Sequence, residues 1–270
     1  MMRTRNKLVL IFFCLLLSAA AVLSGAKIYS ELKERQKEKK DFASVAEIAK
    51  LPMAEAPAES VTDTETETSA EPTEQSVAEH NIQALISENA DCIGWLSIDG
   101  TSISYPVMHT PPDPQKYLRR SFYGKNSQSG VPFLDGRCDL QNTNLIIYGH
   151  NMRDGSMFAS LNEYKEQRYY ESHPQMYLVT PDGGYLCDIF AAFEAKPKES
   201  GSDTSPWRME WKDDGAYTTW LSAMADRSVV ETDVTVTSSD KVLTLSTCTP
   251  GGASRFIVMG KLTEVVTETE

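Results

Sequence analysis

The sequence predicts a mainly β domain, a barrel or a sandwich, that follows an apolar N-terminal segment and an acidic linker. Between residues 80 and 265, roughly eight short runs rich in β-branched and aromatic residues alternate with turns, a pattern typical of antiparallel barrels and sandwiches. Upstream of them, residues 8–26 contain no charged residue, and residues 41–79 contain ten acids against one lysine. The chain therefore divides into an apolar segment, a linker and one domain.

The N-terminal segment predicts a single membrane span. Residues 1–7 are basic, and the uncharged run of residues 8–26 would reach roughly 28 Å as a helix, close to the thickness of a bilayer's hydrocarbon core. The basic flank places the N-terminus in the cytoplasm and the rest of the chain outside. A cleaved signal peptide ending at Ser24-Gly25-Ala26 is the alternative. We favour an uncleaved anchor, because the run exceeds the ~7–15 residues of a signal core.

Residues 27–79 predict a linker in two parts. Residues 27–40 are basic and are expected to be helical, whereas residues 41–79 are acidic, contain several prolines and have one aromatic residue. Such a composition buries too little apolar surface to offset the entropy of the chain. We therefore expect residues 41–79 to be a disordered, extended tether that adds nothing to the packing of the domain at residues 80–270.

Charge and cysteine usage narrow the functional classes. The first 40 residues carry a net charge of +6 and residues 41–79 carry −9, which leaves −9 of the total −12 for residues 80–270. An acidic domain argues against nucleic acid as a partner. The five cysteines and four histidines follow no zinc spacing, and the sequence assigns no disulfide. We expect neither a metal nor a cofactor.

The domain is expected to open with a helix, because Ile82, Leu85 and Ile86 follow a helical spacing. The expected strands are residues 93–98, 102–108, 130–135, 142–149, 175–180, 185–195, 233–237, 241–248 and 255–262. Two helices are expected between them, one from an N-cap at Asp154 and one after Asp213.

Three tryptophans lie in or near the second of these helices: Trp207, Trp211 and Trp220. They could form a platform for a substrate, but a packing face of a helical insertion is the preferred interpretation.

The residues that suggest chemistry follow three strands. Strand alternation places Cys248 on the same, mostly polar, face as Ser246, so that its thiol emerges partly accessible at the strand end. His150 follows the apolar strand that ends at Tyr148-Gly149, and Arg255 opens the last strand. A thiolate nucleophile, an imidazole that exchanges protons and a guanidinium that stabilises an oxyanion are what acyl transfer through a thioester requires. The alternative for Arg255 is a surface charge that closes a hairpin.

These motifs carry a family resemblance. TLSTC followed by an arginine at the next strand, together with the upstream YGHN, resembles the sortases, membrane-anchored cysteine transpeptidases of Gram-positive bacteria. YGHNMRDGSMF and the helical segment before the last strands are similar to the class B group. The resemblance implies an eight-stranded barrel, with His150 as acid and base, Cys248 as nucleophile and Arg255 as stabiliser of the oxyanion or the substrate. It also implies that three further residues line the groove for the sorting signal: Tyr148, Ser246 and Thr247.

The resemblance implies a function and its partners. The enzyme would cleave a sorting signal after a threonine in a secreted protein, hold the acyl group on Cys248 and pass it to an amine of a cell-wall peptidoglycan precursor. A pilin lysine is the alternative acceptor, since CTPGG after the cysteine resembles pilin-polymerising members of the family. Two other classes stay open: a hydrolytic cysteine protease, and a stalked binding module in which Cys248 is unreactive.

Overall fold

The structure is a computed structural model and describes residues 2–49 and 81–265, with side chains from residue 16 onward. The chain forms two compact units, residues 1–41 and 42–270. The first unit is one continuous helix, the beginning of α1 (Met2–Ile48). Of the expected linker at residues 27–79, residues 50–79 lie outside the described residues.

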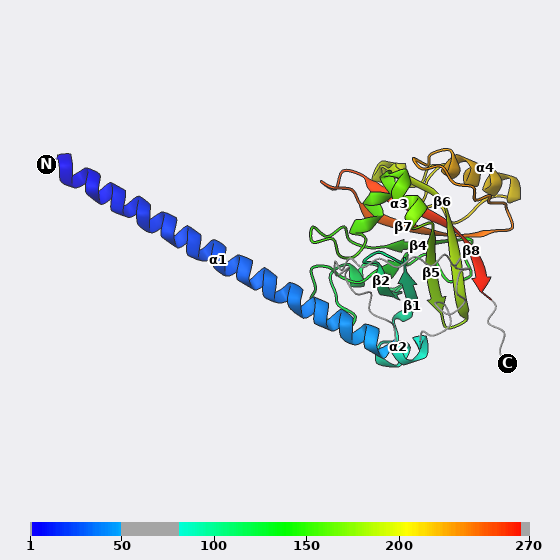
Figure 1. Cartoon of the computed structure of the whole chain (residues 1–270), viewed down its shortest axis with the longest axis horizontal. Coiled ribbons are helices and arrows are strands. Elements are labelled where there is room, and N and C mark those ends of the chain that lie inside the picture. Colours follow the sequence, from blue (N-terminus) through cyan, green and yellow to red (C-terminus); the bar gives the residue numbers. More distant parts are fainter. Residues whose placement is uncertain (1, 50–80, 266–270) are drawn as a thin grey trace, which may run out of the picture. The chain divides into compact units, whose positions relative to one another are not determined.

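The second unit contains a closed eight-stranded barrel, as expected for a mainly β domain (Figure 1). The strands are β1 (Cys92–Ser97), β2 (Ser104–Met108), β3 (Phe133–Leu134), β4 (Asn144–Tyr148), β5 (Gln175–Thr180), β6 (Gly183–Ala195), β7 (Lys241–Cys248) and β8 (Arg255–Val265). Their order around the barrel is β1-β2-β3-β4-β7-β8-β6-β5. Six of the pairings are antiparallel, whereas β2 with β3 and β4 with β7 are parallel. The barrel thus excludes the sandwich, and the pairing of β4 with β7 decides where the candidate active site lies.

Short helices precede the first strand or connect later strands, and they lie outside the barrel (Figure 1). The helices are α2 (Ile82–Glu88), α3 (Gln167–Ser172) and α4 (Asp214–Ala225), and the 3-10 helices are η2 (Lys116–Leu118), η3 (Ala159–Lys165) and η4 (Pro197–Glu199). The expected opening helix and the helix after Asp213 are both confirmed, and the side chain of Asp213 caps α4 by accepting from Ala216 N at 2.8 Å. Side-chain capping of this kind satisfies backbone donors that the first helical turn leaves unpaired.

Two expected elements are wrong. Asp154 caps no helix, because its carboxylate accepts from Ser156 within a turn and the helical segment begins only at Ala159. Residues 233–237 form no strand, although Val234 and Val236 pack against the core as the alternation predicts. The physical reason is closure: β7 already pairs with β4 on one side and β8 on the other, so the barrel offers this segment no free edge.

The boundary of the domain differs from the expectation. Val45 and Ala49 are fully buried, and the Phe42 ring meets the Tyr105 ring edge-on with centroids 5.2 Å apart. These residues belong to the second unit, so the expectation that residues 41–79 contribute no packing is wrong for residues 42–49. Phe42, Val45 and Ala49 follow a helical spacing, which the polar composition of the longer stretch conceals.

The structure describes only part of the expected membrane span. Among the described side chains, no helix is both long enough and apolar enough to cross a bilayer. The expected span at residues 8–26 begins in the part of α1 whose side chains lie outside the described residues.

Tryptophans and cysteines complete the core. Trp211 packs on Tyr217 and Trp220 of α4, as the preferred interpretation predicts, whereas Trp207 lies in the loop before the helix. The four cysteines with described side chains are all free thiols: Cys92, Cys138, Cys187 and Cys248. Burial raises the pKa of Cys92 and of Cys138 to about 11 and also raises the pKa of Cys187. These three thiols therefore behave as small core hydrophobes.

Candidate active site

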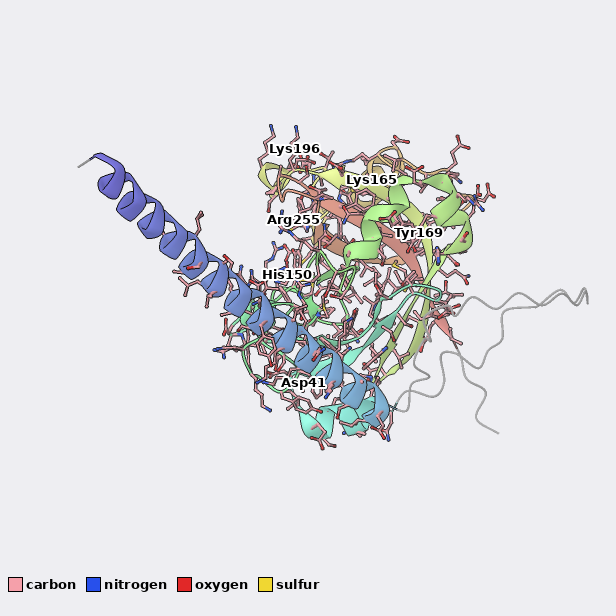
Figure 2. The ribbon with its side chains drawn as sticks, turned by 60° about the vertical axis from the view of Figure 1, so that its left-hand side comes forward. Asp41, His150, Lys165, Tyr169, Lys196 and Arg255 are labelled. Atoms are coloured by element: carbon pink, nitrogen blue, oxygen red, sulfur yellow. The ribbon has the colours of Figure 1, made fainter. Side chains whose placement is uncertain are left out.

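The parallel pairing of β4 with β7 brings two of the expected catalytic residues to one edge of the barrel. The last pair of this ladder joins Tyr148 to Ser246. His150 and Cys248 each follow that pair by two residues, and parallel strands run out of the sheet at the same edge. Arg255 is the antiparallel partner of Cys248 across the β7–β8 pairing. Figure 2 shows His150 and Arg255 on the same flank of the domain.

The imidazole of His150 is held by a backbone carbonyl rather than by a carboxylate. Its Nε2 lies 2.9 Å from the oxygen of Leu118, at the end of η2. Because a carbonyl only accepts, Nε2 bears the proton, and Nδ1 is the nitrogen of the neutral ring that can take one. Burial lowers the pKa of His150, the hydrogen bond to Leu118 opposes this and the charge of Arg119 adds to it.

A glycine allows the carbonyl of Leu118 to lie where it does. Gly130 has a φ of +61°, and a Cβ on it would lie 2.4 Å from the oxygen of Tyr117 and 2.7 Å from that of Leu118. Any other residue at position 130 would therefore push the two carbonyls aside. The partner of His150 thus depends on a close backbone approach in the connection between β2 and β3.

Cys248 presents the accessible thiol. It is partly exposed at the end of β7, whereas the other three cysteines with described side chains are buried. Its backbone oxygen accepts hydrogen bonds from Nδ2 of Asn151 at 2.8 Å and of Asn162 at 3.4 Å. A partly exposed thiol at the same barrel edge as His150 fits a nucleophile better than a structural cysteine.

Arg255 is partly exposed and its guanidinium lies over its own hairpin turn. Nη1 donates to the oxygen of Ser254 at 3.1 Å and to that of Gly252 at 3.4 Å. Its backbone position opposite Cys248 agrees with the sortase role, and its contacts to the turn are those expected of a hairpin arginine. Both of these hydrogen bonds use Nη1, and they hold the side chain on the turn in this structure.

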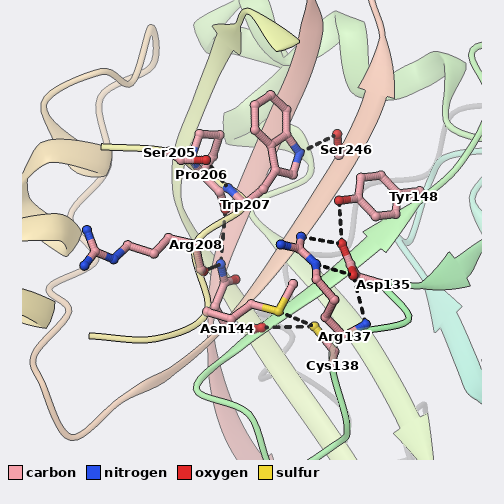
Figure 3. Close-up of polar contacts among 11 residues, drawn as sticks. Asp135, Arg137, Cys138, Asn144, Tyr148, Ser205, Pro206, Trp207, Arg208 and Ser246 are labelled. Carbon is pink, nitrogen blue, oxygen red and sulfur yellow. Dashed lines mark hydrogen bonds and ion pairs between the residues drawn. The ribbon is translucent and has the colours of Figure 1, made fainter. Parts of the chain in front are cut away.

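The expected groove residue Tyr148 belongs to a polar cluster (Figure 3). Its hydroxyl donates to Oδ2 of Asp135 at 2.8 Å, and Arg137 binds both oxygens of the same carboxylate. Burial alone would raise the pKa of Asp135, but the hydrogen bonds from Arg137 and Tyr148 hold it below its usual value. The Tyr148 ring packs on Phe133 and remains partly exposed.

The two other expected groove residues are covered. Ser246 is 2% exposed, and Nε1 of Trp207 donates to its hydroxyl at 3.3 Å (Figure 3). Thr247 is 1% exposed on the opposite face of β7, where its hydroxyl donates to the oxygen of Gly149 at 2.9 Å. In this structure Ser246 therefore lies beneath Trp207, and Thr247 holds the backbone beside His150.

The loop that contains Trp207 is fastened to the β4–β7 face by a buried asparagine. Nδ2 of Asn144 donates to the oxygens of Pro206 and Arg208 at 3.1 and 2.8 Å (Figure 3). Its Oδ1 accepts from Thr244 at 2.6 Å.

A pocket of about 400 Å³ lies beside this loop. Its lining comes from the β3–β4 and β6–β7 connections: Arg137, Asn142, Gly201, Ser202, Asp203, Ser205, Trp207, Arg208, Met209 and Glu210. Within the described residues, no group of three or more His, Cys, Asp or Glu side chains is arranged to hold a metal ion.

Sequence reasoning missed the groups that hold the site together. The carbonyl of Leu118 has no signature in a sequence, because any residue supplies it. The roles of Asn144 and Trp207 depend on partners across the β4–β7 face. Asn151 could have been singled out further, since it adjoins His150 in a motif already noticed.

Comparisons with known proteins agree with this geometry. The family model described as the sortase domain matches residues 96–263. Sortase B of Staphylococcus aureus is 31% identical over 188 residues, which are 68% of this chain and 75% of that protein. Sortase B of Listeria monocytogenes is 32% identical over 179 residues, which are 64% of this chain and 70% of that protein.

Solved structures give the same result. A Staphylococcus aureus sortase B–substrate complex superposes with a TM-score of 0.71 at 26% identity, covering 87% of this chain and all of that one. Sortase B from Bacillus anthracis in complex with AAEK1 gives a TM-score of 0.69 at 29% identity and the same coverage. The chain belongs to the sortase family of cysteine transpeptidases and is similar to its class B members.

Proposed function

We propose that the chain is a single-pass membrane enzyme whose extracytoplasmic domain cleaves a threonine-containing sorting signal and transfers the acyl part to an amine. The observation that supports this most directly is the register of β4, β7 and β8, because it gathers His150, Cys248 and Arg255 at one edge of the barrel. Proteins at 31–32% identity are class B sortases. One related structure is described as a substrate complex and another as a complex with triglycine.

The acylation step follows from the groups in place. Sγ of Cys248 attacks the carbonyl carbon of the threonine, and its proton passes to Nδ1 of His150, the nitrogen left free by the bond to Leu118. Arg255 swings from its hairpin turn to stabilise the oxyanion. His150 then gives the proton to the nitrogen of the departing peptide, and the C–N bond breaks. The product is a thioester on Cys248 and a free amine.

The transfer step runs the same chemistry in reverse. An acceptor amine attacks the thioester carbon and loses a proton to His150 as the new amide bond forms. Sγ of Cys248 leaves and regains a proton, so no oxidant or metal is consumed. The acceptor we propose is an amine of a peptidoglycan precursor, and a pilin lysine is the competing acceptor.

The uncharged run of residues 8–26 supports the membrane part of the proposal. External protease added to intact protoplasts should remove the domain. Full protection of the domain would contradict this topology.

One experiment tests substrate, acceptor and nucleophile together. Purified protein is incubated with a library of threonine-containing pentapeptides, with and without candidate amines, and the products are identified by mass. We expect a peptide–amine conjugate and a thioester adduct on Cys248, both lost in Cys248→Ala without loss of cooperative unfolding. Release of free acid at the same rate with and without amine would favour the hydrolytic protease. Turnover in Cys248→Ala would exclude the proposed nucleophile.

A further inference from the structure

The backbone ladder between β4 and β7 ends just before the catalytic residues. The last residue pair in this pairing is Tyr148 with Ser246, and the last backbone hydrogen bond runs from Gly149 N to the Ser246 oxygen at 3.2 Å. His150 and Cys248 lie beyond this point, where sheet pairing no longer sets the distance between the chains. Strand ends without such pairing are where local opening begins.

Two side chains continue the connection past the ladder. The Thr247 hydroxyl donates to the oxygen of Gly149 at 2.9 Å, and Nδ2 of Asn151 donates to the oxygen of Cys248 at 2.8 Å. Gly149 and Asn151 are the two neighbours of His150 in the sequence. Both sides of the histidine are therefore tied to the last two residues of β7, one of which is the nucleophile.

The loop that contains Asn151 is closed on itself. Phe158 N donates to the oxygen of His150 at 2.8 Å, and Asn151 forms an isolated antiparallel bridge with Met157. Met157 is the only residue other than glycine in the described chain with a positive φ, 57°, and its N–H donates to the hydroxyl of Tyr105 at 3.1 Å. A strained backbone that is held by packing fixes its neighbours. Asn151 thus reaches Cys248 from a loop with little freedom.

The peptide unit after Cys248 is held on both sides. Its oxygen accepts from Asn151 and, at 3.4 Å, from Asn162. Its N–H, which belongs to Thr249, donates to the oxygen of Ser254 at 3.1 Å. Rotation about the backbone of Cys248 would break these bonds, so they fix the direction in which its Cβ–Sγ bond leaves the strand.

We propose that Asn151 and Thr247 act as positioning residues that set the approach of His150 to Cys248. This pair, which we call the dyad clamp, contacts neither substrate nor reacting atoms and acts through the backbones of the two catalytic residues. The inference rests on the proposed function only where transpeptidation rates are measured, because the reactivity of the Cys248 thiol can be measured without a substrate. Small misplacements of reacting groups cost up to about 10²-fold in rate.

The test uses matched variants in the full-length chain. Thr247→Val keeps the shape of the side chain and loses the hydroxyl, whereas Thr247→Ser keeps the hydroxyl. Asn151→Leu removes the amide donor without adding charge. Thr219→Val is the control, since the exposed hydroxyl of Thr219 bonds only within α4, to the oxygen of Gly215.

Two readouts are needed. The first is steady-state transpeptidation, where we expect kcat to fall on the order of 10–100-fold in Thr247→Val and Asn151→Leu, with KM within about twofold. Thr247→Ser should recover most of the rate lost in Thr247→Val. The second is the rate at which a methanethiosulfonate reagent modifies Cys248, followed by the mass of the peptide that contains it. This rate should fall in the same two variants and stay unchanged in Thr219→Val.

The outcomes separate the clamp from the proposed function. If the folded variants keep both the wild-type kcat and the wild-type modification rate, the clamp is refuted while the function stands. If the wild type transfers no peptide but the modification rates still differ, the proposed function fails and the clamp stands. Should Asn151→Leu not fold, the comparison of Thr247→Val with Thr247→Ser decides alone.

Discussion

Replacing Asn144 with alanine should loosen the loop over the active-site face. The side chain is fully buried and makes three hydrogen bonds, two to the backbone oxygens of Pro206 and Arg208 and one from Thr244. At about 1 kcal/mol for each bond, the free energy of unfolding should fall by about 3 kcal/mol. For a domain of this size the melting temperature should fall by roughly 6–12 °C.

The functional effect should accompany the loss of stability. The anchored segment includes Trp207, which covers Ser246 two residues before the nucleophile. We expect Asn144→Ala to raise KM for the sorting peptide more than it lowers kcat, because Trp207, which covers the expected groove residue Ser246, is displaced while the pairing of β4 with β7 next to His150 and Cys248 stays. Thermal unfolding by circular dichroism and steady-state kinetics measure the two effects.

A nearby asparagine supplies the control for this prediction. Asn142 is partly exposed and bonds the backbone N of Asp139 within a surface turn, so Asn142→Ala should cost under about 1 kcal/mol. If Asn144→Ala melts within about 2 °C of the wild type, the three buried bonds do not have the energy assigned to them.

Three further predictions follow from features of the site and the domain boundary. Arg255→Lys keeps the charge and loses the planar fork, so turnover should drop at least roughly 10²-fold with the fold intact; unchanged turnover would make Arg255 a hairpin charge. A chain that begins at residue 80 lacks the buried Val45, so it should melt several degrees below a chain that begins at residue 42, and equal midpoints would show that α1 adds no stability. Because burial lowers the pKa of His150, stability should be complete above the unfolded pKa of about 6.5 and should decline as the pH falls below it. The melting temperature of His150→Gln should therefore fall less on acidification than that of the wild type, and parallel pH curves would argue against the shift.

The barrel and the edge at which the proposed catalytic residues lie could be predicted because they follow local rules. Alternating apolar residues mark strands wherever one face is buried, and eight of the nine expected strands lie where alternation places them. Cys248, His150 and Arg255 were predicted to be catalytic from short motifs and from a family resemblance, and the structure places all three at one edge of the barrel. The prediction of a strand at residues 233–237 was wrong because alternation indicates a buried face and not the presence of a neighbouring strand.

The supporting contacts could not be predicted, because each joins residues that only the fold brings together. Thr244 and Asn144 are 100 positions apart, and Asn151 and Cys248 are 97 positions apart. Thr247 shows the limit most clearly. Its type and its place in TLSTC say nothing of the bond from its hydroxyl to the oxygen of Gly149, because that bond joins two segments that are distant in the sequence.

The parallel pairing of β4 with β7 also determines which changes of chain length the enzyme can tolerate. His150 and Cys248 each lie two residues after the pair of Tyr148 with Ser246, and this spacing fixes their positions at the edge of the barrel. One residue inserted or deleted between Tyr148 and His150, or between Ser246 and Cys248, would turn the side chain of His150 or Cys248 toward the opposite face of the sheet. Insertions in the surface connection between β6 and β7, away from the loop that Asn144 anchors, leave both of these two-residue spacings unchanged. Insertions and deletions among descendants of this chain should therefore accumulate in the β6–β7 connection. They should be absent between Tyr148 and His150 and between Ser246 and Cys248.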